Sequence, residues 1–416
     1  MRKSWLAAMA CAVPMVLSGC GGSAPAGAVG TVGGAAGAKA GATIKIGSLH
    51  PLSGSSAADG QQMDNGAKLA VEAVNKAGGI KSLKGAKLEL LSSDTQGKPE
   101  VGQSEAQRLI QAGAVALVGT YQSAVTTNVS SVAERNKVPL VIDVSSADSI
   151  LKQGYKYTFR VQPSSTVLGT EGAQDLSDVA KAAGSPVKKV AILHEQGPFG
   201  SGIRDAFEAK AKSLGIAIGP DISYDAATVS DLTTQITAVK ASGADVLVVS
   251  GYYRDGVLAA KAVNTVKPAL KAVVGVADGA FDQSQFPKDT GKAGEGYFDA
   301  NYHADMTKPA MQDLAKVYQQ RYGEQIRSGA VLAYDSVRVI AAALEQAGDS
   351  SPVKVRDAIA KVSLESLIAQ KGPITFGDTG ENNNAAPILM QVQSGAVKQV
   401  FPANKAESKP MFPATP

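Results

Sequence analysis

From Thr43 onward the chain alternates short apolar segments with longer segments whose apolar residues recur at helical spacing, and this pattern occurs twice. In the first half we expect helices at 60–75, 99–111 and 123–136 between strands at 44–49, 87–92, 114–118 and 139–144. In the second half we expect helices at 200–214 and 229–242 between strands at 189–193, 216–224 and 244–249. Apolar strands separated by amphipathic helices are typical of parallel sheets covered on both faces. The pattern therefore predicts an α/β protein with two doubly wound, Rossmann-like lobes of similar topology.

The first twenty residues have the features of an export signal. Arg2 and Lys3 precede an apolar run at 5–17, which at about a dozen residues is too short to span a bilayer and fits a secretory signal. The run ends in Leu-Ser-Gly-Cys20, which resembles the lipobox of bacterial lipoproteins. This predicts a signal peptide at 1–19 and a mature chain that begins at a lipidated Cys20, outside the cytoplasm and anchored to the cell membrane. An ordinary signal peptide with an unrelated cysteine is the alternative.

Two further segments have unusual composition. Residues 21–42 consist almost entirely of Gly, Ala, Ser and Val, so they cannot bury enough apolar surface to fold and we expect a flexible linker at 20–42. The last seven residues contain three prolines, which predicts a loose C-terminal end. No later segment approaches the length of an apolar membrane span.

Charge and cysteine content exclude several functional classes. Removing Arg2 and Lys3 with the signal peptide leaves 39 basic and 37 acidic residues, a net charge of +2. Because these charges are interleaved along the chain, we expect no nucleic-acid partner. Cys11 is lost with the signal peptide and Cys20 is acylated, so no disulfide is expected.

Ligands of open parallel sheets bind beyond the carboxyl ends of the strands, where loop amides and helix N-termini meet. The segments that follow the predicted strands are rich in Gly, Ser and aromatic residues, and they lie at 50–54, 119–123, 145–148, 195–200, 250–253 and 277–279. We therefore expect the functional residues among them.

Seven segments give a more specific indication. In order they are IKIGSLHPLSG (44–54), NGAKLAVEAVNKAGGI (65–80), LVGTYQSAVT (117–126), SSADSILKQGYKYTFR (145–160), HEQGPFGSG (194–202), SGYYRDG (250–256) and LAYDSVRVIAAALEQAG (332–348). Together they resemble the type I periplasmic binding proteins of ABC importers, in particular the leucine/isoleucine/valine- and amide-binding group. The resemblance extends from about residue 44 to about residue 400.

The resemblance implies how the chain is divided. It implies two lobes joined by a hinge with three crossings, which close around a ligand. One lobe would comprise 43–162 plus 300–376, and the other 163–299 plus 377–416. Without the resemblance, the repeated pattern alone would suggest two successive halves.

The resemblance also assigns residues to the ligand carboxylate. Ser123, which follows the third strand, matches the serine whose hydroxyl holds that carboxylate. Ser145 and Ser146 match the positions after the fourth strand that supply N–H groups and a hydroxyl. A buried carboxylate needs several hydrogen-bond donors, which fits this placement. The alternative is that all three serines only cap helices.

In the opposite lobe, Phe199 and Tyr252 match rings that pack on an apolar ligand side chain, although either ring could instead close the core of its own lobe. Asp278 matches the acid that pairs with the ligand ammonium. Tyr121, followed by Gln122, resembles relatives that take aromatic or other small organic acids.

The chain departs from the amino-acid binders at two positions. Asp59 stands where they have an aromatic ring, and Gln122 stands where some relatives have a disulfide partner. If Asp59 faces the cleft, it and Asp278 would favour a ligand with a positive charge; otherwise Asp59 is a solvated residue at the rim.

Enzymatic alternatives are weaker. The glycines at 197–202 follow a strand but have GxxGxG spacing, and Pro198 and Phe199 would crowd a pyrophosphate. His50, His194 and His303 are not accompanied by a nucleophile elbow, a metal-binding helix motif or a cysteine nucleophile. A protein of the same fold that presents its ligand to a membrane receptor is a further alternative.

The sequence thus predicts a lipid-anchored solute-binding protein without catalytic activity, cofactor or metal. We expect a monomer that captures a small carboxylate-bearing ligand and delivers it to an ABC permease. A branched-chain or related amino acid is the first candidate, and an aromatic or other small organic acid or an amide is the alternative.

Overall fold

The structure is a computed structural model that describes residues 43–416. The predicted signal peptide at 1–19, the predicted lipid on Cys20 and the linker up to residue 42 lie outside the described residues. Within 43–416, no helix has both the length and the apolar character that a membrane span requires.

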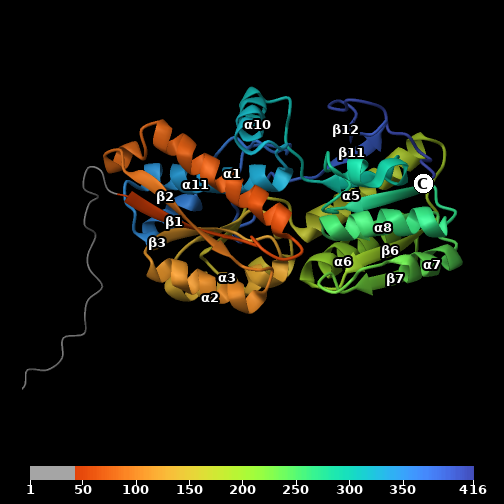
Figure 1. Cartoon of the computed structure of the whole chain (residues 1–416), viewed down its shortest axis with the longest axis horizontal. Coiled ribbons are helices and arrows are strands. Elements are labelled where there is room, and N and C mark those ends of the chain that lie inside the picture. The colour runs from red at the N-terminus through yellow and green to blue at the C-terminus, as the bar shows by residue number, and fades with distance from the viewer. Residues whose placement is uncertain (1–42) are drawn as a thin grey trace, which may run out of the picture. The chain divides into compact units, whose positions relative to one another are not determined.

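Five parallel strands form the first sheet, in the order β2-β1-β3-β4-β5. They are β1 (Thr43–His50), β2 (Lys87–Asp94), β3 (Ala114–Gly119), β4 (Leu140–Ile142) and β5 (Thr158–Arg160). One face is covered by α1 (Ala57–Lys76), α11 (Ser328–Ala347) and α12 (Pro352–Ile359). Residues of α10 (Pro309–Tyr322) belong to the same apolar core, but this helix projects away from the sheet (Figure 1). The other face is covered by α2 (Pro99–Gln111), α3 (Ser123–Asn136) and α4 (Asp148–Leu151). We call this sheet with its helices lobe 1 (Figure 1).

Seven strands form the second sheet, in the order β12-β11-β10-β9-β8-β6-β7. The parallel strands are β6 (Lys189–Glu195), β7 (Ala217–Tyr224), β8 (Val246–Ser250), β9 (Ala272–Val276) and β10 (Phe298–Asn301). Two antiparallel strands complete one side, β11 (Ile388–Gln393) and β12 (Ala396–Phe401). One face is covered by α5 (Ser165–Ala182) and α6 (Pro198–Ser213), and the other by α7 (Thr233–Ser242), α8 (Tyr253–Val266) and α9 (Phe286–Thr290). This is lobe 2.

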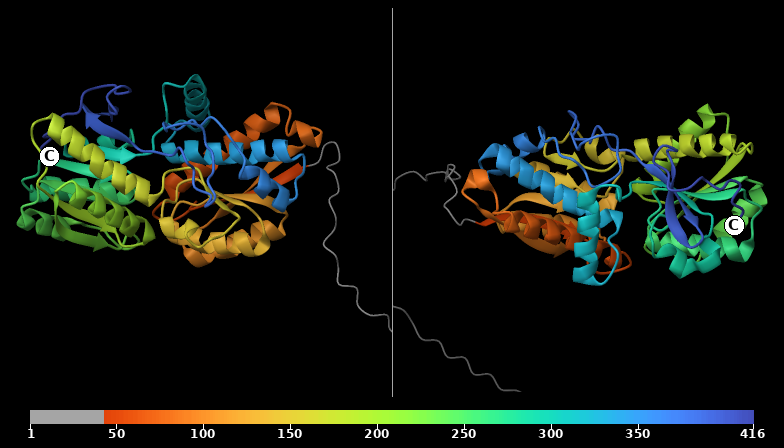
Figure 2. Two further views of the ribbon diagram at one scale, coloured as in Figure 1. Left: turned by 180° about the vertical axis from the view of Figure 1, so that it is seen from behind. Right: turned by 90° about the horizontal axis from the view of Figure 1, so that it is seen from above.

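Each sheet carries helices on both faces (Figure 2), because its strands are apolar on both sides. In β6, Val190 and Ile192 pack under α5 and α6, whereas Ala191 and Leu193 pack under α7 and α8. The prediction of two doubly wound α/β lobes is confirmed. The antiparallel strands β11 and β12 were not predicted.

The chain passes between the lobes three times: after β5, after β10 and again before β11. Where the first and third passages meet, the fully buried guanidinium of Arg160 pairs with Glu381. A second ion pair joins the lobes directly, since Lys371 Nζ lies 2.6 Å from Glu171 Oε1.

Local sequence signals explain several helix ends. Prolines occupy the first position of α2 and α6, where a missing N–H costs no helical hydrogen bond. Gly243 and Gly348 end α7 and α11 with φ angles of 65° and 57°. Glycine adopts these left-handed conformations without the steric cost that a Cβ atom brings.

The C-terminal end is not loose, and that prediction is wrong. The ring of Phe412 packs against Phe298 of β10, with 6.4 Å between ring centroids. The buried amide of Gln391 exchanges two hydrogen bonds with the backbone of Met411, each 2.9 Å long. The last residues therefore lie against lobe 2 rather than free in solvent.

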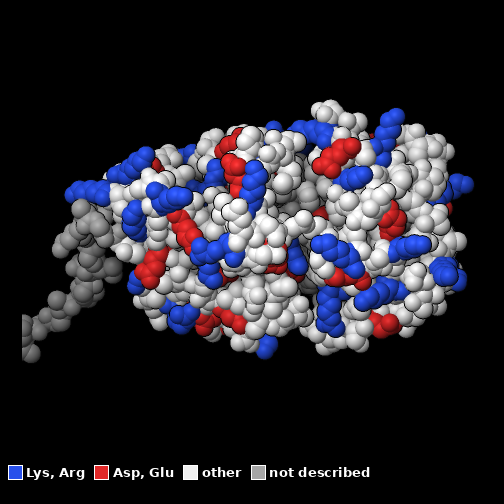
Figure 3. Space-filling model, turned by 45° about the horizontal axis from the view of Figure 1, so that its top comes forward, with Lys and Arg blue, Asp and Glu red and all other residues white. Residues whose placement is uncertain are grey.

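Acidic and basic side chains are interspersed on the face shown in Figure 3. This distribution agrees with the interleaving of charges along the chain.

Candidate ligand-binding site

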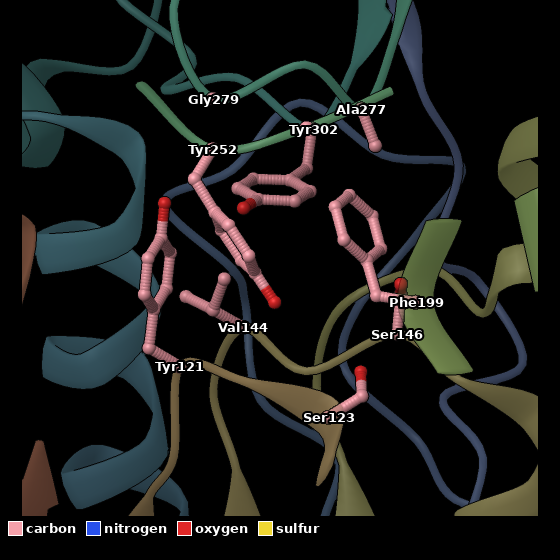
Figure 4. A pocket seen from close by; sticks show the side chains of 10 residues that line it. Tyr121, Ser123, Val144, Ser146, Phe199, Tyr252, Ala277, Gly279 and Tyr302 are labelled. Atoms are coloured by element: carbon pink, nitrogen blue, oxygen red, sulfur yellow. The ribbon is translucent and has the colours of Figure 1, made fainter. Parts of the chain in front are cut away.

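Side chains from both lobes line a small cavity at the carboxyl ends of the strands (Figure 4). Its walls are formed by Tyr121, Ser123, Val144 and Ser146 from lobe 1, by Phe199, Gly251, Tyr252, Ala277 and Gly279 from lobe 2, and by Tyr302 just after β10. The cavity has a volume of about 20 Å³, which is room for about one water molecule. A larger ligand therefore has to separate or rotate the side chains that close it.

Ser123 is the first residue of α3 and lies directly after the loop that follows β3. Its side chain is buried, and its hydroxyl oxygen accepts a hydrogen bond from the Ala147 N–H at 3.3 Å. The hydroxyl proton therefore stays available for another acceptor. The N–H groups of the first turn of a helix also have no acceptor within the helix, so this corner of the cavity is rich in donors.

The two serines after β4 differ in position. Ser146 lines the cavity, and its hydroxyl lies 3.1 Å from that of Ser165 at the start of α5. Ser145 does not line the cavity, because its hydroxyl donates to the Thr120 carbonyl oxygen at 2.7 Å. The structure thus brings Ser123 and Ser146 together and places Ser145 behind them.

The helix N-termini of lobe 2 near this cavity are already covered by protein carboxylates. At the start of α6, Glu195 accepts hydrogen bonds from the N–H groups of Gly197 and Gly200, at 2.6 and 2.7 Å. At the start of α8, Asp255 accepts the Tyr252 N–H at 3.1 Å. The first turn of α3 contains no acidic residue. An incoming anion therefore finds free donors on the lobe 1 side of the cavity.

Four aromatic side chains also line the cavity. Tyr252 contacts Tyr121 of the opposite lobe and Phe199 of its own lobe, with ring centroids 5.3 and 5.6 Å apart. Burial raises the pKa of the Tyr121, Tyr252 and Tyr302 hydroxyls well above the ordinary value. These hydroxyls therefore stay protonated and can donate hydrogen bonds, and the Tyr252 hydroxyl points into the same space as those of Ser123 and Ser146 (Figure 4).

Asp278 is fully buried and does not line the cavity, although its neighbours Ala277 and Gly279 do. Its Oδ1 accepts the Ala280 N–H at 2.9 Å and lies against Gly256 in α8. Its Oδ2 has no hydrogen-bond partner among the described residues. Burial raises the pKa of this carboxyl well above the ordinary value.

The three histidines do not line the cavity either. His50 bonds Asp143 at 2.6 Å, His194 bonds Asp221 at 2.9 Å and His303 bonds Asp282 at 3.1 Å. Within residues 43–416, no group of three or more His, Cys, Asp and Glu side chains is arranged to hold a metal ion.

Several lining residues were not predicted. Gly251, Ala277 and Gly279 lie in segments that follow predicted strands, but they have no functional group that would indicate contact with a ligand. Tyr302 follows β10, a strand that the apolar pattern does not reveal because Asp299 and Asn301 interrupt it. An aromatic residue directly after a strand would have marked Tyr302, had the strand been recognised.

Comparison with known proteins agrees with this architecture. Residues 43–396 match a family model described as periplasmic binding protein. A curated relative from Brucella melitensis, named Leu/Ile/Val-binding protein homolog 8, is 30% identical over 381 residues, which cover 89% of this chain and 93% of the relative.

Solved structures give the same result. A branched-chain amino acid substrate-binding protein from Streptococcus pneumoniae, in complex with isoleucine, aligns with a TM-score of 0.73 and 26% identity over 85% of this chain and 97% of that chain. A solute-binding protein from R. palustris, in complex with benzoate, shares the fold with a TM-score of 0.73, at 18% identity over 86% of this chain and 95% of that chain.

Proposed function

The chain belongs to the periplasmic binding protein family, and from this premise we propose that it captures a small carboxylate-bearing ligand in the cavity between its lobes. Proteins of this family bind ligands and are not enzymes, and the chain is an extracytoplasmic solute-binding protein of an ABC transporter. The proposal adds the kind of ligand and the residues that hold it.

The observation that carries the proposal is the difference between the helix N-termini around the cavity. Glu195 and Asp255 already occupy those of α6 and α8, whereas α3 starts at the cavity wall with no acidic residue in its first turn. The positive end of a helix dipole and its free N–H groups favour an anion. A ligand carboxylate at Ser123 and Ser146 would complete the hydrogen bonding at this end of α3.

An amino acid with an apolar side chain is the first candidate ligand. The name of the Brucella relative and the isoleucine in the pneumococcal structure support this choice. The rings of Phe199 and Tyr252 would pack on the side chain. Asp278 would pair with the ammonium, for which its carboxylate would have to turn from α8 toward the cavity. An ammonium close to Asp278 would stabilise the ionised carboxylate and lower the pKa that burial raises.

An aromatic acid is the second candidate, and the lining of the cavity favours it. None of the residues that line the cavity carries a charged side chain, and four of them are Tyr or Phe. A flat ring could take the place between Tyr121 and Tyr252. In this case Asp278 would have no role in binding.

Calorimetric titration of the purified protein distinguishes the two candidates. Leucine, isoleucine and valine are compared with benzoate, and each acid is compared with its primary amide, which lacks the carboxylate. We expect one of the two acid series to bind and the matching amide to bind much more weakly. Equal affinity for an acid and its amide would contradict recognition of a carboxylate.

The predicted lipid anchor completes the proposed function. A diacylglycerol on Cys20 would keep the protein at the membrane surface, where it would meet the permease as a monomer. Cys20→Ala is expected to release the protein from the membrane fraction and to abolish its labelling by radioactive palmitate. A variant that stays bound and labelled would disprove attachment at Cys20.

A further inference from the structure

A second small cavity adjoins the first and shares three wall residues with it, namely Tyr121, Gly279 and Tyr302. It has a volume of about 30 Å³. The remaining wall includes Asp59, Gln62 and Arg327 from lobe 1 and Gln283 from lobe 2. Because the two cavities have a common wall of two tyrosines and a glycine, movement of these tyrosine side chains would join them into one elongated space.

An ion pair forms one side of this second cavity. Asp59 lies in the first turn of α1, and its carboxylate accepts a hydrogen bond from Nη1 of Arg327, which immediately precedes α11. The Asp59 and Arg327 side chains are only 14% and 17% exposed. Tyr121 donates a long hydrogen bond of 3.5 Å to the other oxygen of Asp59. The Arg327 backbone is held by Gln62, whose side-chain oxygen accepts its N–H at 3.1 Å.

This pairing changes what Asp59 can recognise. An isolated carboxylate would attract a positively charged group, but Arg327 compensates the charge of Asp59. The remaining N–H groups of the Arg327 guanidinium have no hydrogen-bond partner among residues 43–416. The pair therefore offers a donor edge beside a carboxylate acceptor, with no net charge.

We propose that the Asp59–Arg327 pair is a second subsite of the ligand cleft, which recognises an uncharged polar group at the end of the ligand opposite its carboxylate. A hydroxyl or a carboxamide can both accept from Arg327 and donate to Asp59. A charged end would lose hydration without meeting a net opposite charge, and an apolar end would leave the pair without a partner. This inference rests on the proposed function, because it takes the carboxylate to lie at Ser123.

The subsite is completed only when the lobes are together. The guanidinium of Arg327 lies over the ring of Tyr253 in lobe 2, at 5.0 Å from the centroid. The hydroxyl of Tyr253 donates to Asp289 at 2.6 Å, which holds the ring in place. Binding of the far end of the ligand would therefore be coupled to contact between the lobes.

The test uses two series of probes, each with a constant carboxylate end and a different group at the far end. The amino acids are norleucine, glutamine, glutamate and lysine, and the aromatic acids are benzoate, 4-hydroxybenzoate, benzene-1,4-dicarboxylate and 4-(aminomethyl)benzoate. Calorimetric titration gives the Kd of each for the purified protein. In the series that binds, we expect the neutral polar probe to bind at least tenfold tighter than the apolar probe and than either charged probe.

Single variants should change this order in opposite directions. D59N leaves Arg327 without its carboxylate partner, so glutamate or the dicarboxylate should become the preferred probe. R327M leaves Asp59 alone, so lysine or the aminomethyl probe should become preferred. Ratios of Kd within one variant do not depend on the fraction of protein that is folded. E72Q is the matched control, because it breaks an exposed ion pair of α1, that of Glu72 with Arg321, outside both cavities.

The outcomes separate the two proposals. Binding of norleucine or benzoate without any preference among far-end groups would overturn the subsite and leave the proposed function standing. If D59N and R327M change the Kd of all probes by the same factor, the subsite is overturned as well, because such a result would indicate a purely structural role of the ion pair. If no probe binds the unaltered protein, both the proposed function and the subsite are contradicted.

Discussion

Replacement of Ser123 by alanine tests the proposed carboxylate position most directly. The Ser123 hydroxyl accepts the Ala147 N–H at 3.3 Å, and its own proton remains available for the ligand. Loss of a hydrogen bond to a charged group costs about 1–3 kcal/mol, which corresponds to a rise in Kd of roughly 5- to 150-fold. We expect a value in the upper part of this range, because Ser123 is buried and water cannot easily replace its hydroxyl.

The same substitution also affects stability, and the two effects must be measured separately. Ala147 is buried, so S123A leaves its N–H without an acceptor, which lowers the free energy of unfolding by about 1–3 kcal/mol. Denaturant unfolding without ligand measures this loss. Calorimetric titration at 25 °C, where the variant is folded, measures the change in Kd.

Ser130 provides the matched control on the same helix. Its buried hydroxyl donates to the Thr127 carbonyl oxygen at 2.9 Å and lies outside the cavity. We expect S130A to leave Kd unchanged. The reasoning is refuted if S123A binds the ligand as tightly as the unaltered protein, or if S123A weakens the acid and its primary amide by the same factor.

Three other substitutions test the fold. Arg160→Met should lower the free energy of unfolding in urea by about 1–3 kcal/mol, since it removes the donor to Glu381 and to the buried carbonyl oxygens of Ser145 and Ala147; a loss below 1 kcal/mol would contradict this. Burial and, to a smaller extent, the negative charge of Glu171 raise the pKa of Asp175 to about 7. The folded state therefore favours the protonated form of Asp175, and the protein loses stability as pH rises from about 4 to about 7. Asp175→Asn should therefore raise the melting temperature more at pH 8 than at pH 4.5, and an equal shift at both would be contrary to this. Gly66→Ala should destabilise the protein by about 1–3 kcal/mol in thermal unfolding, because the added Cβ would overlap the Ala330 carbonyl oxygen of α11; an unchanged transition would show that α1 and α11 can move apart.

Much of the fold could be predicted because the apolar pattern is regular. The bounds of α2 and α3 agree with the predicted segments, since a proline starts α2 and apolar residues repeat at helical spacing in both. The strand β10 escaped prediction because Asp299 and Asn301 are buried there. Their side chains bond to each other and to the Asp278 backbone, so hydrogen bonding rather than hydrophobicity places them.

Those residues of the candidate site that directly follow predicted strands could be identified from the sequence. The structure places Ser123, Ser146, Phe199, Tyr252 and Tyr121 at one cavity, and their contact with ligand stays a prediction. The direction of the Asp278 side chain could not be predicted, because a strand-end position does not say which way a side chain turns.

The partner of Asp59 could not be predicted from the sequence either. Arg327 is 268 residues away in the chain, and no local pattern connects the two. Only the packing of α11 beside α1 brings them together.

That packing has a consequence for how the protein folds. Helix α1 lies against α11, and residues of both belong to the same apolar core, although α1 ends at Lys76 and α11 begins at Ser328. A growing chain therefore cannot complete the core of lobe 1 until residue 347 has been synthesised, whereas β6 to β9 of lobe 2 can pair within one continuous segment. Contacts of such long range make folding slow, because a large loop must close before they form. The core of lobe 1 would therefore close only after most of the chain has been synthesised, although all five strands of its sheet lie in the N-terminal part of the chain.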